Sequence, residues 1–160
     1  MKKNEIKELI PYIIIIIVVL LFRAFVADPI RVKGPSMNNT LKNGDIMILN
    51  RHGDLERGKI VVVKVSKTKI IKRIIGLPGD TLYAQNGVLY LNDEVYEEDY
   101  ISSRTKDFKK VFLRDNEYFV LGDNRAISED SSVFGPVTKD QILGTTNFTV
   151  FPFSKFGKIE

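Results

Sequence analysis

A long apolar run near the N-terminus restricts the folds open to this chain more than any other feature. The stretch from Leu9 to Phe22 is continuously apolar, and extending it to Ala27 adds only one charge, Arg23, close to an end. A membrane-spanning helix needs about 20 such residues. In lipid, only a helix satisfies the backbone hydrogen bonds of a single segment. We therefore expect residues 9–27 to form a transmembrane helix.

Two alternatives to an anchor remain for this run. It could be a cleaved signal peptide, or a strand or helix buried in a protein core. The signal peptide is disfavoured because Phe25 stands where a small residue is needed for cleavage after Ala27. Basic residues lie on both sides of the run, so the positive-inside rule does not fix its orientation.

Composition excludes several classes of site. The 160 residues contain no cysteine, which rules out disulfides, thiolate catalysis and cysteine-based zinc sites. The net charge of +4 comes from scattered Lys and Arg residues and indicates an ordinary surface, not one that binds nucleic acid. The single histidine, His52, lies in a polar turn, so we expect neither a Ser–His–Asp triad nor a histidine metal site.

Behind the apolar run, the pattern changes to short Ile- and Val-rich segments separated by Gly, Asn, Asp and Pro. These segments are too short for typical helices and predict strands. An Asn-Gly pair at 86–87 predicts a hairpin, whereas 92–116 is charged and poorly patterned and is expected to be rich in loops. The expected fold is all-β, with a coiled or barrel-like antiparallel sheet. The expected strands are 45–50, 59–65, 69–77, 81–84, 88–91, 117–121 and 146–151.

Ser36 is a candidate nucleophile. It follows the pair Gly34-Pro35, where the backbone is expected to turn, so its hydroxyl can project from the chain. A serine nucleophile needs a base, and the base has to come from elsewhere in the chain.

Lys72 is a candidate base. In a strand it would share a face with Ile70 and Ile74. Burial between two isoleucines disfavours the ammonium and lowers the pKa of the lysine, and a neutral amine can accept a proton from a serine. The alternative is a lysine on an edge strand that discourages aggregation. The strand alone leaves both interpretations open.

The segment 122–135 is dense in hydrogen-bonding side chains and directly follows an apolar strand. On its own it would predict a turn or a cation-binding loop. Its spacing does not fit the twelve-residue calcium loop, and we expect no metal and no cofactor.

Together, these segments resemble the type I signal peptidases, which use a Ser–Lys dyad, in their compact Gram-positive form. The resemblance rests on Gly-Pro-Ser-Met at 34–37 with Thr-Leu at 40–41, on 57–63, on Lys-Arg-Ile-Ile-Gly-Leu-Pro-Gly-Asp at 72–80, and on Gly-Asp-Asn-Arg at 122–125 with Ser-Glu-Asp-Ser at 128–131. The motifs follow the family's order and cover essentially the whole chain.

The resemblance implies a role for each matched residue. Ser36 would be the nucleophile, with its backbone N–H donating to the oxyanion, and Lys72 would be the general base. Ser128 would orient the Lys72 amine. Asp123 and Asp130 would hold their loop through Arg73 and Arg125. The remaining support residue of the matched motif is Asn124.

The resemblance also implies how substrate binds. The signal peptide would lie extended between Val32 and the strand of Lys72, with small side chains at the first and third residues before the cut. These would enter two shallow apolar pockets. The matched positions are Ile30, Val32, Met37, Leu41, Ile70 and Ile71.

Three positions depart from the family's common pattern. Gly34 replaces a hydroxyl residue that completes the oxyanion hole in many members, Asn39 replaces a proline, and Ser132 replaces an arginine that would partner Asp130. None of these changes removes the dyad, but together they allow a slow or specialised enzyme.

The resemblance implies a single-pass, monomeric protein of the plasma membrane, with signal peptides of exported preproteins and membrane lipid as partners. Residues 1–8 would be cytoplasmic, 9–27 the anchor, and 28–160 the extracytoplasmic peptidase domain, with 81–118 a variable insertion. One alternative is a non-catalytic relative that assists assembly of pilin-like subunits, although such relatives tend to lose one member of the dyad. A self-cleaving repressor is disfavoured because no DNA-binding segment is apparent.

Overall fold

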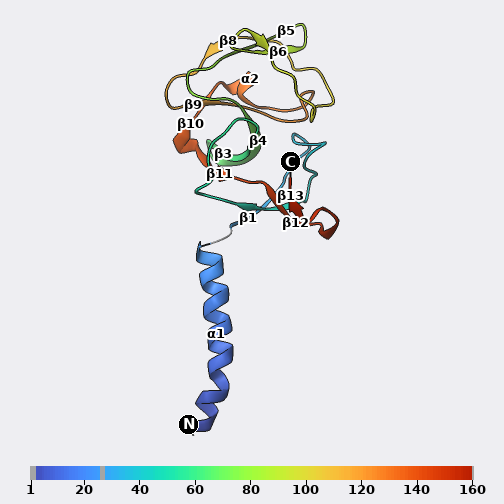
Figure 1. The fold of residues 1–160 in the computed structure, drawn as a ribbon. Coiled ribbons are helices and arrows are strands. Elements are labelled where there is room, and N and C mark those ends of the chain that lie inside the picture. Colours follow the sequence, from blue (N-terminus) through green and yellow to red (C-terminus); the bar gives the residue numbers. More distant parts are fainter. Residues whose placement is uncertain (1–2, 26–27, 160) are drawn as a thin grey trace.

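The computed structural model describes residues 3–25 and 28–159 (Figure 1). It begins with one helix, α1 (Lys3–Phe25), which contains Pro11. The side chains from 8 to 19 are exposed on every side of this helix. Residues 26 and 27 of the expected anchor lie outside the described residues. Within the part of the chain that is described, no helix is long and apolar enough to cross a membrane.

The remainder of the described chain is mostly β-structure. Two short 3-10 helices, η1 (Lys139–Gln141) and η2 (Phe153–Lys155), and one four-residue helix, α2 (Ser131–Phe134), interrupt the strands. The strands are β1 (Asp28–Arg31), β2 (Ile46–Leu49), β3 (Ile60–Val65), β4 (Thr68–Gly76), β5 (Thr81–Gln85), β6 (Val88–Leu91), β7 (Glu94–Val95), β8 (Phe108–Phe112), β9 (Glu117–Leu121), β10 (Val137–Thr138), β11 (Ile142–Thr145), β12 (Phe148–Phe151) and β13 (Gly157–Lys158).

These strands form three sheets, in the orders β1-β2-β12-β13, β10-β9-β4-β3-β11 and β7-β6-β5-β8. All strand pairings are antiparallel. The five-stranded sheet curls and lies between the other two in Figure 1. The prediction of an all-β domain with a coiled antiparallel sheet is therefore confirmed.

Each strand expected from the sequence is present, with small shifts at its ends. The Asn86-Gly87 turn joins β5 to β6, and both turn residues have positive φ, +55° and +81°, as a tight hairpin turn requires. The sequence did not predict β1, β7, β8, β10, β11 or β13. The loop-rich interpretation of 92–116 is wrong for Glu94–Val95, which forms β7 and pairs with β6, and for Phe108–Phe112, which forms β8 and pairs with β5.

β4 is the central strand of the five-stranded sheet and carries Lys72. It pairs with β3 on one side and with β9 on the other. From Ile71 to Gly76, every residue of β4 is buried. Ile70 and Ile74 pack in the same apolar cluster, which confirms that they share a face. The alternative of an edge-strand lysine is therefore wrong.

Candidate active site

Ser36 lies in a turn between β1 and β2. Gly34 precedes it with φ +81°, a conformation that favours glycine, and the Gly34 N–H donates to Asn43 Oδ1 at 3.1 Å. Behind the serine, the Leu41 N–H donates to the Met37 carbonyl at 2.8 Å. Met37 and Leu41 are buried whereas Ser36 is half-buried. The turn is thus anchored in the core, and its serine reaches the surface.

Lys72 is buried in the centre of the domain and bonded to Ser128. Lys72 is only 2% exposed, and Ser128 is 3% exposed. Lys72 Nζ donates to Ser128 Oγ at 3.0 Å. Burial lowers the pKa of Lys72, opposed by the carboxylates of Asp130, Asp123 and Glu129, which raise it. The neutral form of Lys72 is therefore more favoured in this site than it would be in water.

At Gly122, the turn that carries Ser36 comes close to Ser128, the hydrogen-bond partner of Lys72. We call residues 34–41 the nucleophile turn. A Cβ added there would lie 2.6 Å from the Ser36 carbonyl oxygen and 2.7 Å from Ser128 Cβ. The Asn124 N–H also donates to the Ser36 carbonyl at 3.0 Å, and Asn124 Nδ2 donates to the Pro35 carbonyl at 3.2 Å. The structure therefore brings Ser36, Ser128 and, through Ser128, Lys72 into one site.

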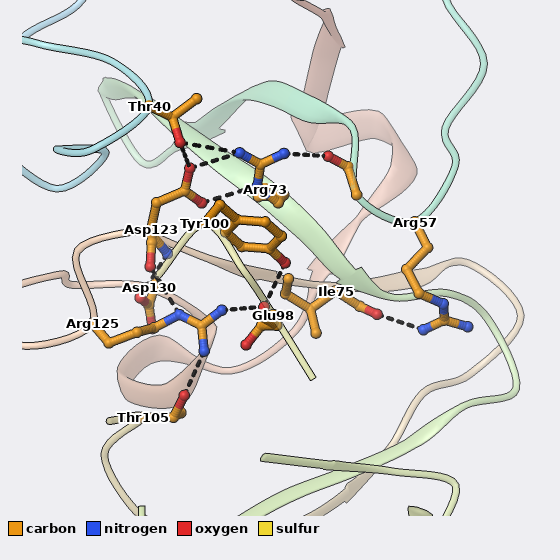
Figure 2. A network of polar contacts seen from close by, with 12 residues as sticks. Thr40, Arg57, Arg73, Ile75, Glu98, Tyr100, Thr105, Asp123, Arg125 and Asp130 are labelled. Atoms are coloured by element: carbon orange, nitrogen blue, oxygen red, sulfur yellow. Dashed lines mark hydrogen bonds and ion pairs between the residues drawn. The ribbon is translucent and has the colours of Figure 1, made fainter. Parts of the chain in front are cut away.

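Arg73 and Asp123 form a buried ion pair beside this site (Figure 2). Arg73 Nε donates to Asp123 Oδ1 at 3.0 Å, and Nη2 donates to Oδ2 at 2.7 Å. The Thr40 hydroxyl donates to the same carboxylate at 2.5 Å. The pair joins β4, which carries Lys72, to the loop that carries Ser128, and Thr40 joins it to the nucleophile turn. This contact agrees with the role expected for Asp123.

Arg125 has a different partner from the one expected. Its guanidinium donates to the carboxylate of Glu98 and to the hydroxyl of Thr105, and its Nε donates to the Gly122 carbonyl at 3.0 Å. Asp130 Oδ2 instead accepts from the Gly122 N–H at 3.0 Å. The expectation that Asp130 holds the loop through Arg125 is therefore wrong, because Arg125 turns toward the segment before β8.

The six residues expected to line substrate pockets divide between two clusters. Ile70 packs with Ile74, as described above. The other five share the cluster at the base of the nucleophile turn: Ile30, Val32, Met37, Leu41 and Ile71. Three of them are at most 2% exposed, namely Val32, Met37 and Leu41. In this structure those three side chains are core, and the half-buried Ile30 and Ile70 offer apolar surface.

The three departures from the family pattern each have a local structural counterpart. Asn39 has φ +94°, which proline, with φ near −65°, cannot adopt. Ser132 donates to Asp130 Oδ1 through its N–H at 3.2 Å and its hydroxyl at 2.7 Å, so neutral donors occupy the carboxylate that an arginine would otherwise partner. Gly34 has the positive φ of +81° described above, which favours glycine over a residue with a side chain.

Sequence reasoning missed four residues of this site. Thr40 touches both Arg73 and Asp123. The other three lie in the poorly patterned excursion and surround the two arginines: Glu98, Tyr100 and Thr105. Their local sequence carries no strand or motif signal, and only the fold brings them to the site. Over the described ranges 3–25 and 28–159, no group of three or more His, Cys, Asp or Glu residues could hold a metal ion.

Comparisons with known proteins agree on one family. A family model described as "Signal peptidase, peptidase S26" matches residues 6–151. Signal peptidase I S of Bacillus subtilis (strain 168) is 39% identical, covering 98% of this chain and 95% of its own length. Signal peptidase IB of Staphylococcus aureus is 35% identical, with coverage of 98% and 94%.

A solved structure points the same way. The crystal structure of a signal peptidase I from Enterococcus faecalis V583 is similar with a TM-score of 0.53 and 30% identity. The match covers 58% of this chain and 97% of that one. The buried Lys72–Ser128 contact beside the Ser36 turn thus occurs on a fold shared with known signal peptidases. The chain is a peptidase and belongs to the signal peptidase family, peptidase S26.

Proposed function

We propose that this peptidase removes N-terminal signal peptides from exported preproteins, with Ser36 as nucleophile and Lys72 as general base. The observation that carries the proposal is the 3.0 Å hydrogen bond from Lys72 Nζ to the buried Ser128 hydroxyl. The loop of Ser128 is bonded in turn to the Ser36 carbonyl through Asn124. A lysine held in this way, with its pKa lowered by burial, is suited to accept a proton from a neighbouring serine.

The proposed acylation step begins with neutral Lys72. As Lys72 Nζ accepts the Ser36 hydroxyl proton, Ser36 Oγ bonds to the scissile carbonyl carbon and the carbonyl oxygen becomes the oxyanion. The Ser36 N–H donates to that oxyanion. When the intermediate collapses, the C–N bond breaks and the Lys72 ammonium gives its proton to the leaving amine. The signal peptide remains as an ester on Ser36, and the mature protein departs with a new N-terminus.

Deacylation uses the same two residues. A water molecule gives a proton to Lys72 as its oxygen bonds to the ester carbon, and the ammonium then returns that proton to Ser36 Oγ as the ester bond breaks. Ser128 keeps the Lys72 amine on the side where both transfers occur. The cycle needs no cofactor, because every proton taken up by Lys72 is released in the same half-reaction.

Specificity for small residues before the cut follows from the apolar surface near Ser36. We propose that the half-buried Ile30 and Ile70 form walls on either side of the cleavage site, and that the buried Val32, Met37 and Leu41 form the floor. A floor of tightly packed core side chains leaves shallow pockets, which accept Ala but not a bulky residue. Cleavage after Ala-X-Ala is the expected preference.

Membrane attachment through residues 9–27, with 28–160 outside the cell, is also part of the proposal. It is supported by the continuous apolar run from Leu9 to Phe22 and by side chains exposed all round α1 from 8 to 19. Membranes washed with alkaline carbonate should retain the wild-type protein and lose a variant with Ile15→Asp and Val18→Asp. Equal release of both proteins would argue against the anchor.

The test of the activity uses a purified preprotein whose signal peptide ends in Ala-X-Ala, with the enzyme in detergent or lipid. Wild type should release the mature protein with the expected N-terminus, and Ser36→Ala should not. Ser154→Ala, which changes an exposed serine in η2, is the matched control and should be active. Equal cleavage by wild type and Ser36→Ala would contradict Ser36 as the nucleophile, and cleavage by neither would favour the assembly-factor alternative.

A further inference from the structure

The excursion between β7 and β8 returns to the catalytic centre. Within 96–107, Glu98, Tyr100 and Thr105 contact the two arginines that support the site (Figure 2). These three residues form a group that we call the 98–105 clamp. The clamp lies far in sequence from each partner, and Glu98 and Arg125 are 27 positions apart. Its contacts are therefore made by the fold and not by a local turn.

The first arm of the clamp holds Arg73. The Arg73 guanidinium carbon lies 4.0 Å from the centre of the Tyr100 ring, and the Arg73 side chain is 6% exposed. A buried guanidinium over an aromatic face is attracted by the ring. Arg73 is fixed on its other edge by Asp123, so Tyr100 and Asp123 together restrict its position. Arg73 directly follows Lys72 in β4.

The second arm holds Arg125. The Tyr100 hydroxyl donates to Glu98 Oε1, and the same oxygen accepts from Arg125 Nη2. The Glu98 and Arg125 side chains are 1% and 2% exposed. Arg125 also bonds to the Gly122 carbonyl at 3.0 Å. Through Glu98, the clamp therefore fixes the start of the loop that carries Ser128.

The Tyr100 hydroxyl remains a donor throughout the pH range in which a lysine titrates. Burial, and then the hydrogen bond to Glu98, raises the pKa of Tyr100. The hydroxyl therefore stays protonated and continues to bond Glu98. The backbone of Tyr100 provides a third contact, because its carbonyl accepts from Asn39 Nδ2 at 3.4 Å. Asn39 belongs to the nucleophile turn, so one residue touches all three parts of the site.

We propose that Tyr100 and Glu98 are positioning residues of the peptidase, which hold Ser128 against Lys72 and keep water from the Lys72 amine. The inference rests on the proposed function of Ser36 and Lys72 and extends it. Without the Tyr100 side chain, Arg73 loses the ring that it lies over, and Glu98, the partner of Arg125, loses the hydroxyl that donates to it. The Asp123–Ser128 loop can then move away from Lys72. The substrate-facing residues Ile30 and Ile70 are not contacted by this change, so turnover should suffer and substrate binding should not.

The test compares Tyr100→Leu, Tyr100→Phe and a control, Tyr90→Leu, in preprotein cleavage. Tyr90 stacks on Tyr83 in the outer sheet, so its truncation removes a similar aromatic contact away from the site. Tyr100→Leu should lower kcat roughly 10- to 100-fold, as small displacements of catalytic groups do, with KM unchanged. Tyr100→Phe keeps the ring over Arg73 and should lose less activity. Tyr90→Leu should retain wild-type kcat.

A double variant asks whether Tyr100 acts through Ser128. In a Ser128→Ala background the hydroxyl that the clamp positions is absent, so adding Tyr100→Leu should lower kcat little further. A merely structural role would lower kcat by the same factor in both backgrounds. An undiminished second loss would therefore overturn the inference, as would wild-type kcat in Tyr100→Leu.

A second measurement needs no turnover. The pKa of Lys72 can be followed by NMR with ¹³Cε-labelled lysine in the Ser36→Ala protein, with Lys72→Arg to assign the signal. The charged groups acting on Lys72 are Asp130, Asp123 and Glu129. Tyr100→Leu should raise the pKa of Lys72 toward its ordinary value because water reaches the amine, whereas Tyr90→Leu should not. An unchanged pKa in Tyr100→Leu would refute the clamp. A raised pKa in a protein that cleaves no preprotein would uphold the clamp and refute the proposed function.

Discussion

Lys72 Nζ lies 3.0 Å from Ser128 Oγ, although 56 residues separate the two along the chain. The contact forms because β4 and β9 pair in the centre of the curled sheet, and the loop after β9 turns back over Lys72. Both residues are almost fully buried. A lysine in this position loses hydration yet keeps one hydroxyl partner, which fixes the direction of its amine.

Removing that partner should reduce turnover without unfolding the protein. In Ser128→Ala the Lys72 amine is free to rotate, so we expect kcat to fall roughly 10- to 100-fold. KM should change little because Ser128 is buried and cannot contact substrate directly. Steady-state kinetics beside the control Ser154→Ala checks this. Equal kcat in the two variants would mean that Ser128 does not orient Lys72.

The buried Lys72 should lower the free energy of unfolding at neutral pH, relative to a variant with an apolar residue at position 72. Lys72→Met removes a buried amine and should raise the free energy of unfolding by about 1 kcal/mol while abolishing cleavage. Burial lowers the pKa of Lys72 in the folded state. At pH values between this lowered pKa and the ordinary pKa of lysine, the folded state therefore binds fewer protons than the unfolded state. Wild-type stability should therefore rise with pH in that window.

The gain from Lys72→Met should accordingly be greatest below the folded-state pKa of Lys72 and shrink as the pH approaches the ordinary value. Thermal or urea unfolding of both proteins across this range measures the difference. The surface variant Lys64→Met, in the exposed part of β3, controls for loss of charge alone. A gain that did not vary with pH would show that the pKa of Lys72 is not lowered by folding.

Gly122 should tolerate no side chain. Its Cβ would approach the Ser36 carbonyl oxygen, a backbone atom, to 2.6 Å, so the nucleophile turn or the loop would have to move. We expect Gly122→Ala to lower kcat by about 100-fold, since misplacement near 1 Å has effects of that size. Gly122 does not have a positive φ, so the loss would come from the close approach and not from backbone strain. Wild-type kcat in Gly122→Ala would refute the close approach.

Two substitutions at Gly34 can distinguish the effect of backbone strain from the effect of a hydroxyl that stabilises the oxyanion. Nothing lies within 4 Å of a Cβ at this position, but φ is +81°, so both Gly34→Ala and Gly34→Ser should lose roughly 1–2 kcal/mol of stability. The hydroxyl is the only difference between the two variants. If a donor to the oxyanion is missing, Gly34→Ser should have the higher kcat of the pair. Equal kcat values would indicate that another group already donates there.

The sequence allows the central features of the fold to be predicted because they are local. The isoleucines on either side of Lys72 predict a buried strand, and β4 is buried from Ile71 onward. Asn86-Gly87 predicts the β5–β6 turn by its need for positive φ. By contrast, β8 escapes prediction because its adjacent lysines, Lys109 and Lys110, are both exposed and break the alternation of apolar residues.

The supporting contacts could not be predicted, because they depend on how distant segments pack. The bond from Asn39 to the Tyr100 carbonyl spans 61 residues. Glu98 lies among acidic residues that resemble any solvated loop, yet its carboxylate is buried against Arg125. The expected pairing of Arg125 with Asp130 failed for the same reason. A motif places charges near one another but does not decide which of several carboxylates an arginine reaches.

The most direct test of the account is the pH–rate profile of preprotein cleavage by wild type and Lys72→Arg. Arginine keeps the charge and much of the bulk but cannot supply a neutral base. Wild-type kcat should fall along one acidic limb as Lys72 takes up a proton. Lys72→Arg should be folded and inactive at every pH, while Lys64→Arg should match wild type. If Lys72→Arg retained a substantial fraction of wild-type kcat, Lys72 would not be the base and the Ser36–Lys72 mechanism would be wrong.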